Sequence, residues 1–115
     1  MLSWDGAITL KRTTPTYGVS VAINTSLANW FSINANNGVG FMITNPTNPP
    51  TGPGCCITIT IRNASAGRLG AVVWDTLYKL ATWTSPATGF SRSITFGWDG
   101  TDWVEVSRTP SDVPN

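Results

Sequence analysis

The carboxylates are the first residues to test for chemistry, because the 115-residue sequence contains no histidine. Without histidine, neither a Ser-His-Asp nor a Cys-His arrangement can form, and the usual general base is missing. A glycosidase needs two carboxylic acids across a cleft, yet Asp5 and Asp99 each precede a glycine, where hydrogen bonding within a turn accounts for them. The remaining acids are Asp75, Asp102, Glu105 and Asp112. The sequence predicts no catalytic residue and no enzyme.

Asp99 and Asp102 are the best candidates for a metal site, since carboxylate oxygens are hard ligands that suit calcium. Their spacing does not match the twelve-residue calcium loop, and two acids beside a turn are ordinary. Cys55 and Cys56 are adjacent, so on a strand they point to opposite faces and a bridge between them would be strained. We expect free thiols, as in a reducing cytoplasm, and neither a metal nor any other cofactor.

The balance of charge excludes two classes of partner. Lysine and arginine total seven against six acids, and charged residues make up only 11% of the chain. The chain therefore lacks the strong positive electrostatic field that would attract nucleic acid or an anionic membrane. No apolar run approaches the roughly 20 residues that would span a bilayer, and the first residues lack the order of a signal peptide. We expect synthesis in the host cytoplasm, with no nucleic-acid partner and no membrane insertion.

Strand signals are dense, whereas helical periodicity is poor throughout. The clearest strand alternates Ile57, Ile59 and Ile61 with polar residues, which buries one face. The sequence predicts an all-β fold, an antiparallel β-sandwich or jelly-roll of about eight strands in a single domain. The domain is expected over 19–115, after an N-terminal arm or first strand over 1–18. Strands are expected at 7–12, 17–23, 29–33, 39–44, 55–63, 71–74, 77–80, 90–96 and 102–108.

The hairpin FGWDGTDWVEVSR (96–108) places two tryptophans beside an Asp-Gly turn. If Ile94 pairs with Val104 through a three-residue loop with Gly100 left-handed, Trp103 lies on the face opposite the aliphatic core. Trp98 then sits at the turn. Two interpretations stay open: Trp103 covers the outer sheet as a cross-strand neighbour, or it anchors a partner subunit or a ligand.

Six tryptophans in a chain of this length are more than one core easily encloses, so some are expected at interfaces. Trp83, in a polar and turn-rich stretch, is a second candidate, and Trp4 lies in another Trp-Asp-Gly tripeptide. The stretch TNPTNPPTGPG (44–54) cannot join a ladder, so Pro49 and Pro50 are expected on a surface loop. Arg92 is expected on the polar face of its strand, either solvated or paired with acids of a neighbouring subunit.

Three stretches carry a resemblance: ITITIRNASAGRLGAVVW (57–74), LYKLATWTSPATGFSRSITFGWDGTDWVEVSR (77–108) and the terminal TPSDVPN. They resemble a small β-rich module of tailed-bacteriophage virion proteins, found at the end of a tail fibre or spike and as a stand-alone protein. The resemblance implies a homotrimeric virion component that either decorates and clamps the capsid or recognises host glycans. It assigns no residue-level roles.

Two functions from different classes follow. The first is a homotrimeric capsid decoration, or cement, protein on the outer surface of the head, which binds the major capsid protein and stabilises the shell through buried area. The alternative is the carbohydrate-binding tip domain of a tail fibre or spike, with exposed tryptophans stacking on sugar rings of a host surface glycan. The candidate contact residues are Trp4, Trp83, Trp98, Trp103, Arg92, Pro49 and Pro50.

Overall fold

The computed structural model describes residues 11–115, so Trp4, its Trp-Asp-Gly tripeptide and most of the expected arm lie outside the described residues. The described part is all β and forms a single domain, as expected. It contains no helix, and hence no helix that could cross a membrane. The strands are β1 (Arg12–Thr13), β2 (Ser20–Val21), β3 (Trp30–Ala35), β4 (Phe41–Ile43), β5 (Cys56–Asn63), β6 (Val72–Trp74), β7 (Tyr78–Lys79), β8 (Phe90–Trp98), β9 (Trp103–Arg108) and β10 (Val113–Pro114).

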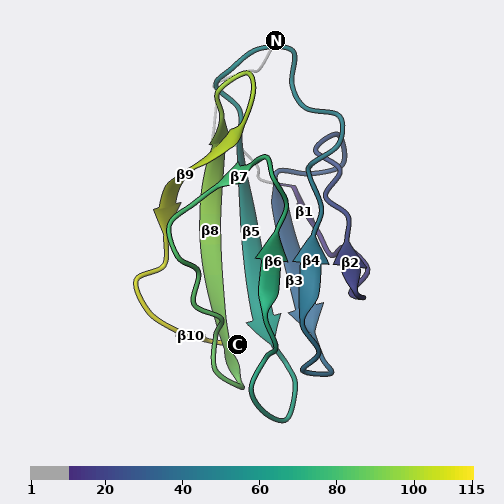
Figure 1. The fold of residues 1–115 in the computed structure, drawn as a ribbon, viewed down its shortest axis with the longest axis vertical. Helices are drawn as coiled ribbons and strands as arrows, with labels where there is room; N and C mark the ends of the chain where they lie inside the picture. Colours follow the sequence, from purple (N-terminus) through teal and green to yellow (C-terminus); the bar gives the residue numbers. More distant parts are fainter. Residues whose placement is uncertain (1–10) are drawn as a thin grey trace.

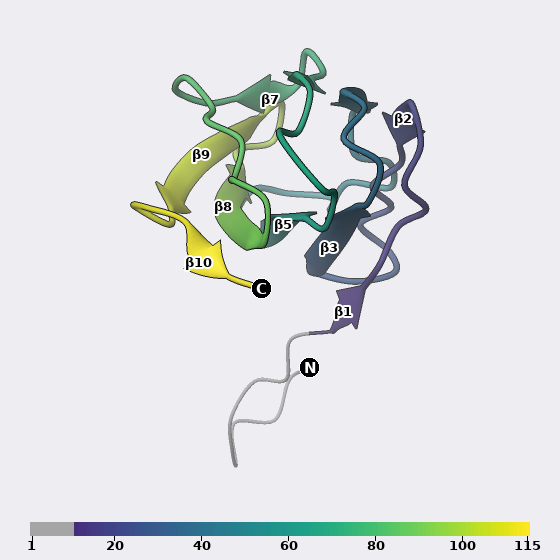
Figure 2. The ribbon, with the colours of Figure 1, turned by 90° about the horizontal axis from the view of Figure 1, so that it is seen from below.

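The strands form two sheets that face each other (Figures 1 and 2). The larger sheet has the order β1-β3-β5-β8-β9-β7, with β10 also paired to β8, and the smaller has the order β2-β4-β6. Figure 2 shows the larger sheet curving through β8 and β9 toward β7, which lies on the side of the smaller sheet. The space between the sheets holds the apolar core.

The first six strands alternate between the sheets, so the chain winds as a coil instead of folding into hairpins. β1, β3 and β5 are parallel neighbours in the larger sheet, and β2, β4 and β6 are parallel neighbours in the smaller one. Among the strands of residues 11–115, only β5–β8, β8–β9 and β8–β10 pair antiparallel. The pairing is therefore mixed and not antiparallel throughout, because each of β1 to β6 is followed by a crossing to the opposite sheet and not by a tight turn.

Apolar side chains stack in register across the larger sheet. Phe31 on β3 lies beside Ile59 on β5, which lies beside Ile94 on β8, and all three are buried. Ile33 and Ile61 form the next row, and Phe41 and Ile43 of β4 are among the buried residues that the smaller sheet contributes. The alternation of isoleucine with threonine in β5 thus buries one face, as the period of two predicts.

The hairpin of β8 and β9 corrects the register expected from the sequence. Trp98 pairs with Trp103 around a turn of residues 99–102, so Gly97 and not Ile94 lies opposite Val104. Gly100 has a positive φ of 99°, as expected. Farther along the hairpin, Phe96 pairs with Glu105, but the preceding residue Thr95 pairs with Ser107. One residue of β9 is therefore left without a partner, which is a β-bulge.

Both tryptophans of this hairpin are core residues. Trp98 ends β8 directly before the turn but is buried, and the expectation that Trp103 lies on the outer face is wrong. Trp103 has no exposed surface and Trp98 is 9% exposed, with ring centroids 5.0 Å apart. Val104, which the expected register places beside Ile94 in the core, is exposed, and so is Val106. The register that buries two indole rings removes more apolar area from water than one that buries two valines. Neither tryptophan is therefore available for a contact with a partner.

Two glycines let neighbouring turns of the coil touch. A Cβ on Gly70 would lie 2.5 Å from the backbone nitrogen of Gly40, and a Cβ on Gly40 would lie 2.6 Å from the carbonyl oxygen of Ala71. The amide of Gly70 also donates to the carbonyl of Gly38 at 2.8 Å. Because the colliding atoms are backbone atoms, a side chain at either glycine must push the turns apart.

Gly70→Ala is expected to lower the free energy of unfolding by about 1–3 kcal/mol, the usual cost of forcing extra atoms into a packed region. Gly67→Ala, in the same loop, has open space around its Cβ and should change stability by less than about 0.5 kcal/mol. Urea denaturation followed by tryptophan fluorescence measures both. Equal midpoints for the two variants would contradict the close approach.

Candidate ligand-binding site

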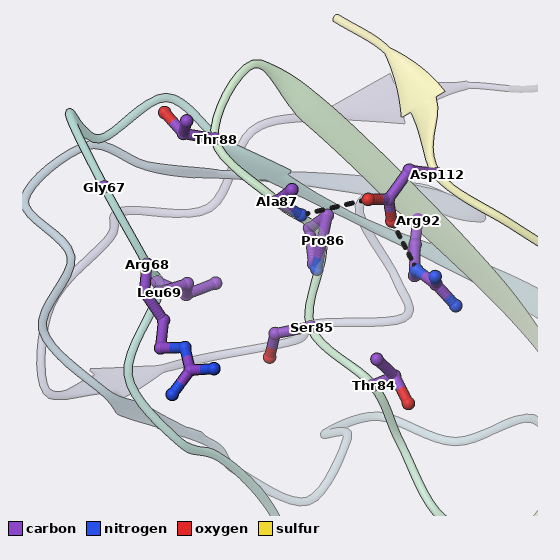
Figure 3. A pocket seen from close by; sticks show the side chains of 10 residues that line it. All are labelled: Gly67, Arg68, Leu69, Thr84, Ser85, Pro86, Ala87, Thr88, Arg92 and Asp112. Carbon is purple, nitrogen blue, oxygen red and sulfur yellow. Dashed lines mark hydrogen bonds and ion pairs between the residues drawn. The ribbon is translucent and has the colours of Figure 1, made fainter.

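A pocket of about 570 Å³ opens at the end of the domain where β5 ends and β8 begins. Its walls come from the loop after β5, the segment before β8, the start of β8 and the residue that precedes β10 (Figure 3). Segments far apart in the sequence therefore meet at this end. The lining residues are Gly67, Arg68, Leu69, Thr84, Ser85, Pro86, Ala87, Thr88, Arg92 and Asp112.

Arg92 reaches the pocket because it continues the core face of β8. It lies opposite Ile61 in the ladder, and it follows the buried residues Phe96 and Ile94 at a spacing of two. The expectation that Arg92 lies on the polar face is therefore wrong. Arg62, by contrast, pairs with Ser91 on the outer face. The apolar residues on this face of β8 end at Ile94, and the next position on the same face is Arg92, whose guanidinium lies at the edge of the core.

Asp112 fixes this guanidinium. Arg92 donates from Nε to Oδ1 of Asp112 at 2.6 Å, and the backbone amide of Ala87 donates to Oδ2 at 3.2 Å (Figure 3). The hydrogen bond from Arg92, followed by that from Ala87, lowers the pKa of Asp112, so its carboxylate is ionised at neutral pH. The pair links β8 to two of the pocket's walls. Within the described residues, the two Nη nitrogens of Arg92 make no hydrogen bond and stay available.

Asn63, at the end of β5, holds two other walls together. Its Nδ2 donates to the carbonyls of Gly67 and Pro86, at 3.1 Å each, and its Oδ1 accepts from the amide of Ser65 at 3.1 Å. The side chain is fully buried, so an apolar substitute would leave buried backbone carbonyls without partners. Asn63 positions the walls and does not itself line the pocket.

The rest of the pocket presents hydrogen-bonding groups to solvent. Figure 3 shows Arg68 and Arg92 on opposite sides, with Ser85 and Pro86 between them. Arg68 is exposed, and neither its guanidinium nor the hydroxyls of Thr84 and Ser85 bond to another described residue. Thr88 is different, because its hydroxyl donates to the carbonyl of Ser65. The free groups are donors and acceptors that a polar ligand can use.

Most carboxylates of the described residues accept local hydrogen bonds; the exception is the side chain of Asp102. Asp99 accepts hydrogen bonds from the amides of Thr101 and Asp102, at 2.8 and 2.6 Å, which confirms its turn role and lowers its pKa. Asp75 accepts from the amide of Asn45 at 3.0 Å. Among residues 11–115, no group of three His, Cys, Asp or Glu residues could hold a metal ion. Among the described residues, Asp112 is the one acid that lines the pocket.

Trp83 packs inward and is half buried. Its ring meets that of Trp74 edge to face at 5.4 Å, and the guanidinium of Arg108 lies 5.7 Å from its ring centroid. Arg108 is held by Glu105, with 2.8 Å from Nη2 to Oε1, on the same side of β9. Because the bulge shifts the register, Arg108 lies beside Ile94. Trp83 therefore offers a partner less surface than the sequence suggested.

Pro49 and Pro50 lie in the loop before β5, at the opposite end of that strand from the pocket. Pro49 is exposed and Pro50 half buried, so their role in partner contacts stays a prediction. Cys55 and Cys56 are free thiols, as expected. Sequence reasoning did not select Arg68 and Asp112, which line the pocket, or Asn63, which holds its walls together. The Asn-x-Ser signal of a turn directly after a strand could have pointed to Asn63.

Comparisons with known proteins give no family for this chain, because no family model, curated protein or solved structure matches it. A functional assignment therefore depends on the geometry of the pocket and on the chemistry of the residues around it.

The ion pair of the pocket predicts a pH dependence of stability. The lowered pKa of folded Asp112 means that the pair stabilises the fold above the unfolded carboxyl value of about 3.9, and that this stabilisation is lost as pH falls through the folded value. Asp112→Asn should have a lower urea midpoint than the wild type at pH 7, and the two midpoints should converge at the acid end. A difference that stays constant with pH would contradict the role of the charge.

Proposed function

We propose that this chain is a carbohydrate-binding module of a bacteriophage virion, which recognises a glycan of the host surface through the pocket at the β5–β8 end. The observation that carries the proposal is the set of unengaged guanidinium and hydroxyl groups around one preformed hollow. The virion setting comes from the resemblance of residues 57–108 and of the terminal segment to phage modules. Of the described residues that line the pocket, Asp112 alone is an acid, so the proposed activity is binding without hydrolysis.

The size and chemistry of the pocket support a saccharide ligand. Its volume of about 570 Å³ lies within the range of roughly 300–1,000 Å³ that small-molecule sites occupy. Sugar hydroxyls both donate and accept hydrogen bonds, which matches the hydroxyls of Thr84 and Ser85 and the Nη groups of Arg92. The methylene carbons of the exposed Arg68 side chain add apolar surface for the face of a sugar ring.

The walls are held in place without a ligand. Asn63 bonds to both the Gly67 and the Pro86 segments, and Asp112 bonds to Arg92 and to the segment at Ala87. A site that is ordered before binding loses less conformational entropy when the ligand enters. This preorganisation supports recognition of a small ligand over the ordering of a long flexible partner.

Gly67→Trp tests the pocket directly. Gly67 lines the pocket, and a side chain there has open space and an ordinary backbone conformation, so the variant should fold. We expect its binding to host-surface glycans to fall at least about tenfold, a loss of about 1.4 kcal/mol. Gly52→Trp, in the proline loop, is the matched control because it also enters open space. Host polysaccharide binding that survives Gly67→Trp unchanged would contradict the proposal.

A homotrimeric decoration protein of the phage head is the second candidate, and apolar residues on the smaller sheet favour it. Val73 is 52% exposed on β6 and lies beside Met42 of β4. Val19 and Val39, which precede β2 and β4, are also exposed. Clustered apolar residues on a surface are typical of contacts between subunits. Such contacts would use this sheet, since Trp98 and Trp103 are buried inside the chain.

Mass by light scattering, followed by sedimentation with purified heads, tests this second function. A decoration protein should have three times the mass of one chain and should sediment with the heads. Val73→Asp should return it to the mass of one chain, whereas Val106→Asp, at an exposed position of the larger sheet, should not. A wild-type protein with the mass of one chain that stays in the supernatant would exclude the decoration role.

A further inference from the structure

The pocket has an excess of positive charge. Two arginines and one acid line it, and no other charged residue of the described part of the chain does. Asp112 is bound to Arg92, so the charges of these two residues largely cancel. Arg68 has no such partner among the described residues. The uncompensated charge of the pocket is therefore on the guanidinium of Arg68.

The two arginines have different capacities. Arg92 uses Nε to bind Asp112, so a second carboxylate placed against it would lie close to the first and be repelled. Its free Nη groups suit neutral acceptors such as hydroxyl or ring oxygens. The whole planar guanidinium of Arg68 is free, and such a group can bind a carboxylate through two parallel hydrogen bonds.

Between the arginines lie groups that suit a sugar ring. Ser85 lies between Arg68 and Arg92 in Figure 3, and Thr84 lies below Arg92 in the same view. Neither hydroxyl bonds to another described residue. A ligand that spans the pocket would place its acid group at Arg68 and its hydroxyls near Ser85, Thr84 and the Nη groups of Arg92.

We infer that the ligand is an acidic saccharide, whose carboxylate binds the guanidinium of Arg68 while Arg92 and Ser85 bind its hydroxyl oxygens. This inference rests on the proposed function and names the class of glycan. It goes further by dividing the work between the arginines: Arg68 selects for the negative charge, and the Arg92–Asp112 pair orients the sugar.

A glycan array tests the inference with paired probes. It carries uronic-acid and sialic-acid oligosaccharides beside their carboxyl-reduced, neutral counterparts. The wild-type protein should bind acidic probes at least about tenfold more tightly than the neutral member of the same pair, in line with the strength of charged hydrogen bonds. Because an exposed guanidinium is screened by salt, this preference should shrink as sodium chloride is raised.

Variants separate the inference from the proposed function. Arg68→Gln should remove the preference for acidic probes, Arg68→Lys should keep part of it, and Arg62→Gln, on the outer face of β5, should leave it intact. The inference would be overturned if the wild-type protein bound acidic and neutral probes equally, if Arg68→Gln left that binding unchanged, and if Gly67→Trp abolished it. The same result would still support carbohydrate binding in the pocket. No bound glycan of either kind would overturn both.

Discussion

The in-register stacking of apolar side chains across β3, β5 and β8 is the constraint from which the rest of the structure follows. Phe31, Ile59 and Ile94 form one continuous row between the sheets. Neighbouring strands can share such a row only if their side-chain alternation is in phase. The parallel pairing of β3 and β5, and the coil that brings the chain back to the same sheet, satisfy this requirement. The close contact of Gly40 and Gly70 lets the turns of the coil approach.

The pocket is a consequence of where the apolar rows end. On β8 the core face passes from Ile94 to Arg92, and on β5 it passes from Ile61 to the buried amide of Asn63. Both polar side chains therefore point toward the interior at the same end of the domain. They are accommodated because Asp112 neutralises one and backbone carbonyls bond to the other. The interactions that satisfy these buried or half-buried polar groups also hold the walls of the pocket.

Much of the fold could be predicted from residue types alone. Strict alternation in β5 and dense turn signals gave the positions of most strands, and Gly100 gave the turn of the final hairpin. The pairing partners could not be predicted, because alternation reports which face is buried and not whether a neighbour runs parallel. The predicted register of the hairpin was wrong because an equally simple pattern of apolar residues placed Val104 in the core. The observed register buries Trp103, which removes more apolar area from water, and a bulge in β9 accommodates it.

The site was harder to predict, because its residues become neighbours only through the fold. Arg68, Arg92 and Asp112 come from three separate segments, and no local spacing connects them. The chemical shifts of backbone amides during titration with a bound acidic oligosaccharide would test the central claim most directly. We predict changes confined to residues 67–69, 84–88, 92 and 112. Changes centred instead on Trp30 and Thr58, on the outer face of the larger sheet, would contradict a binding site in the pocket.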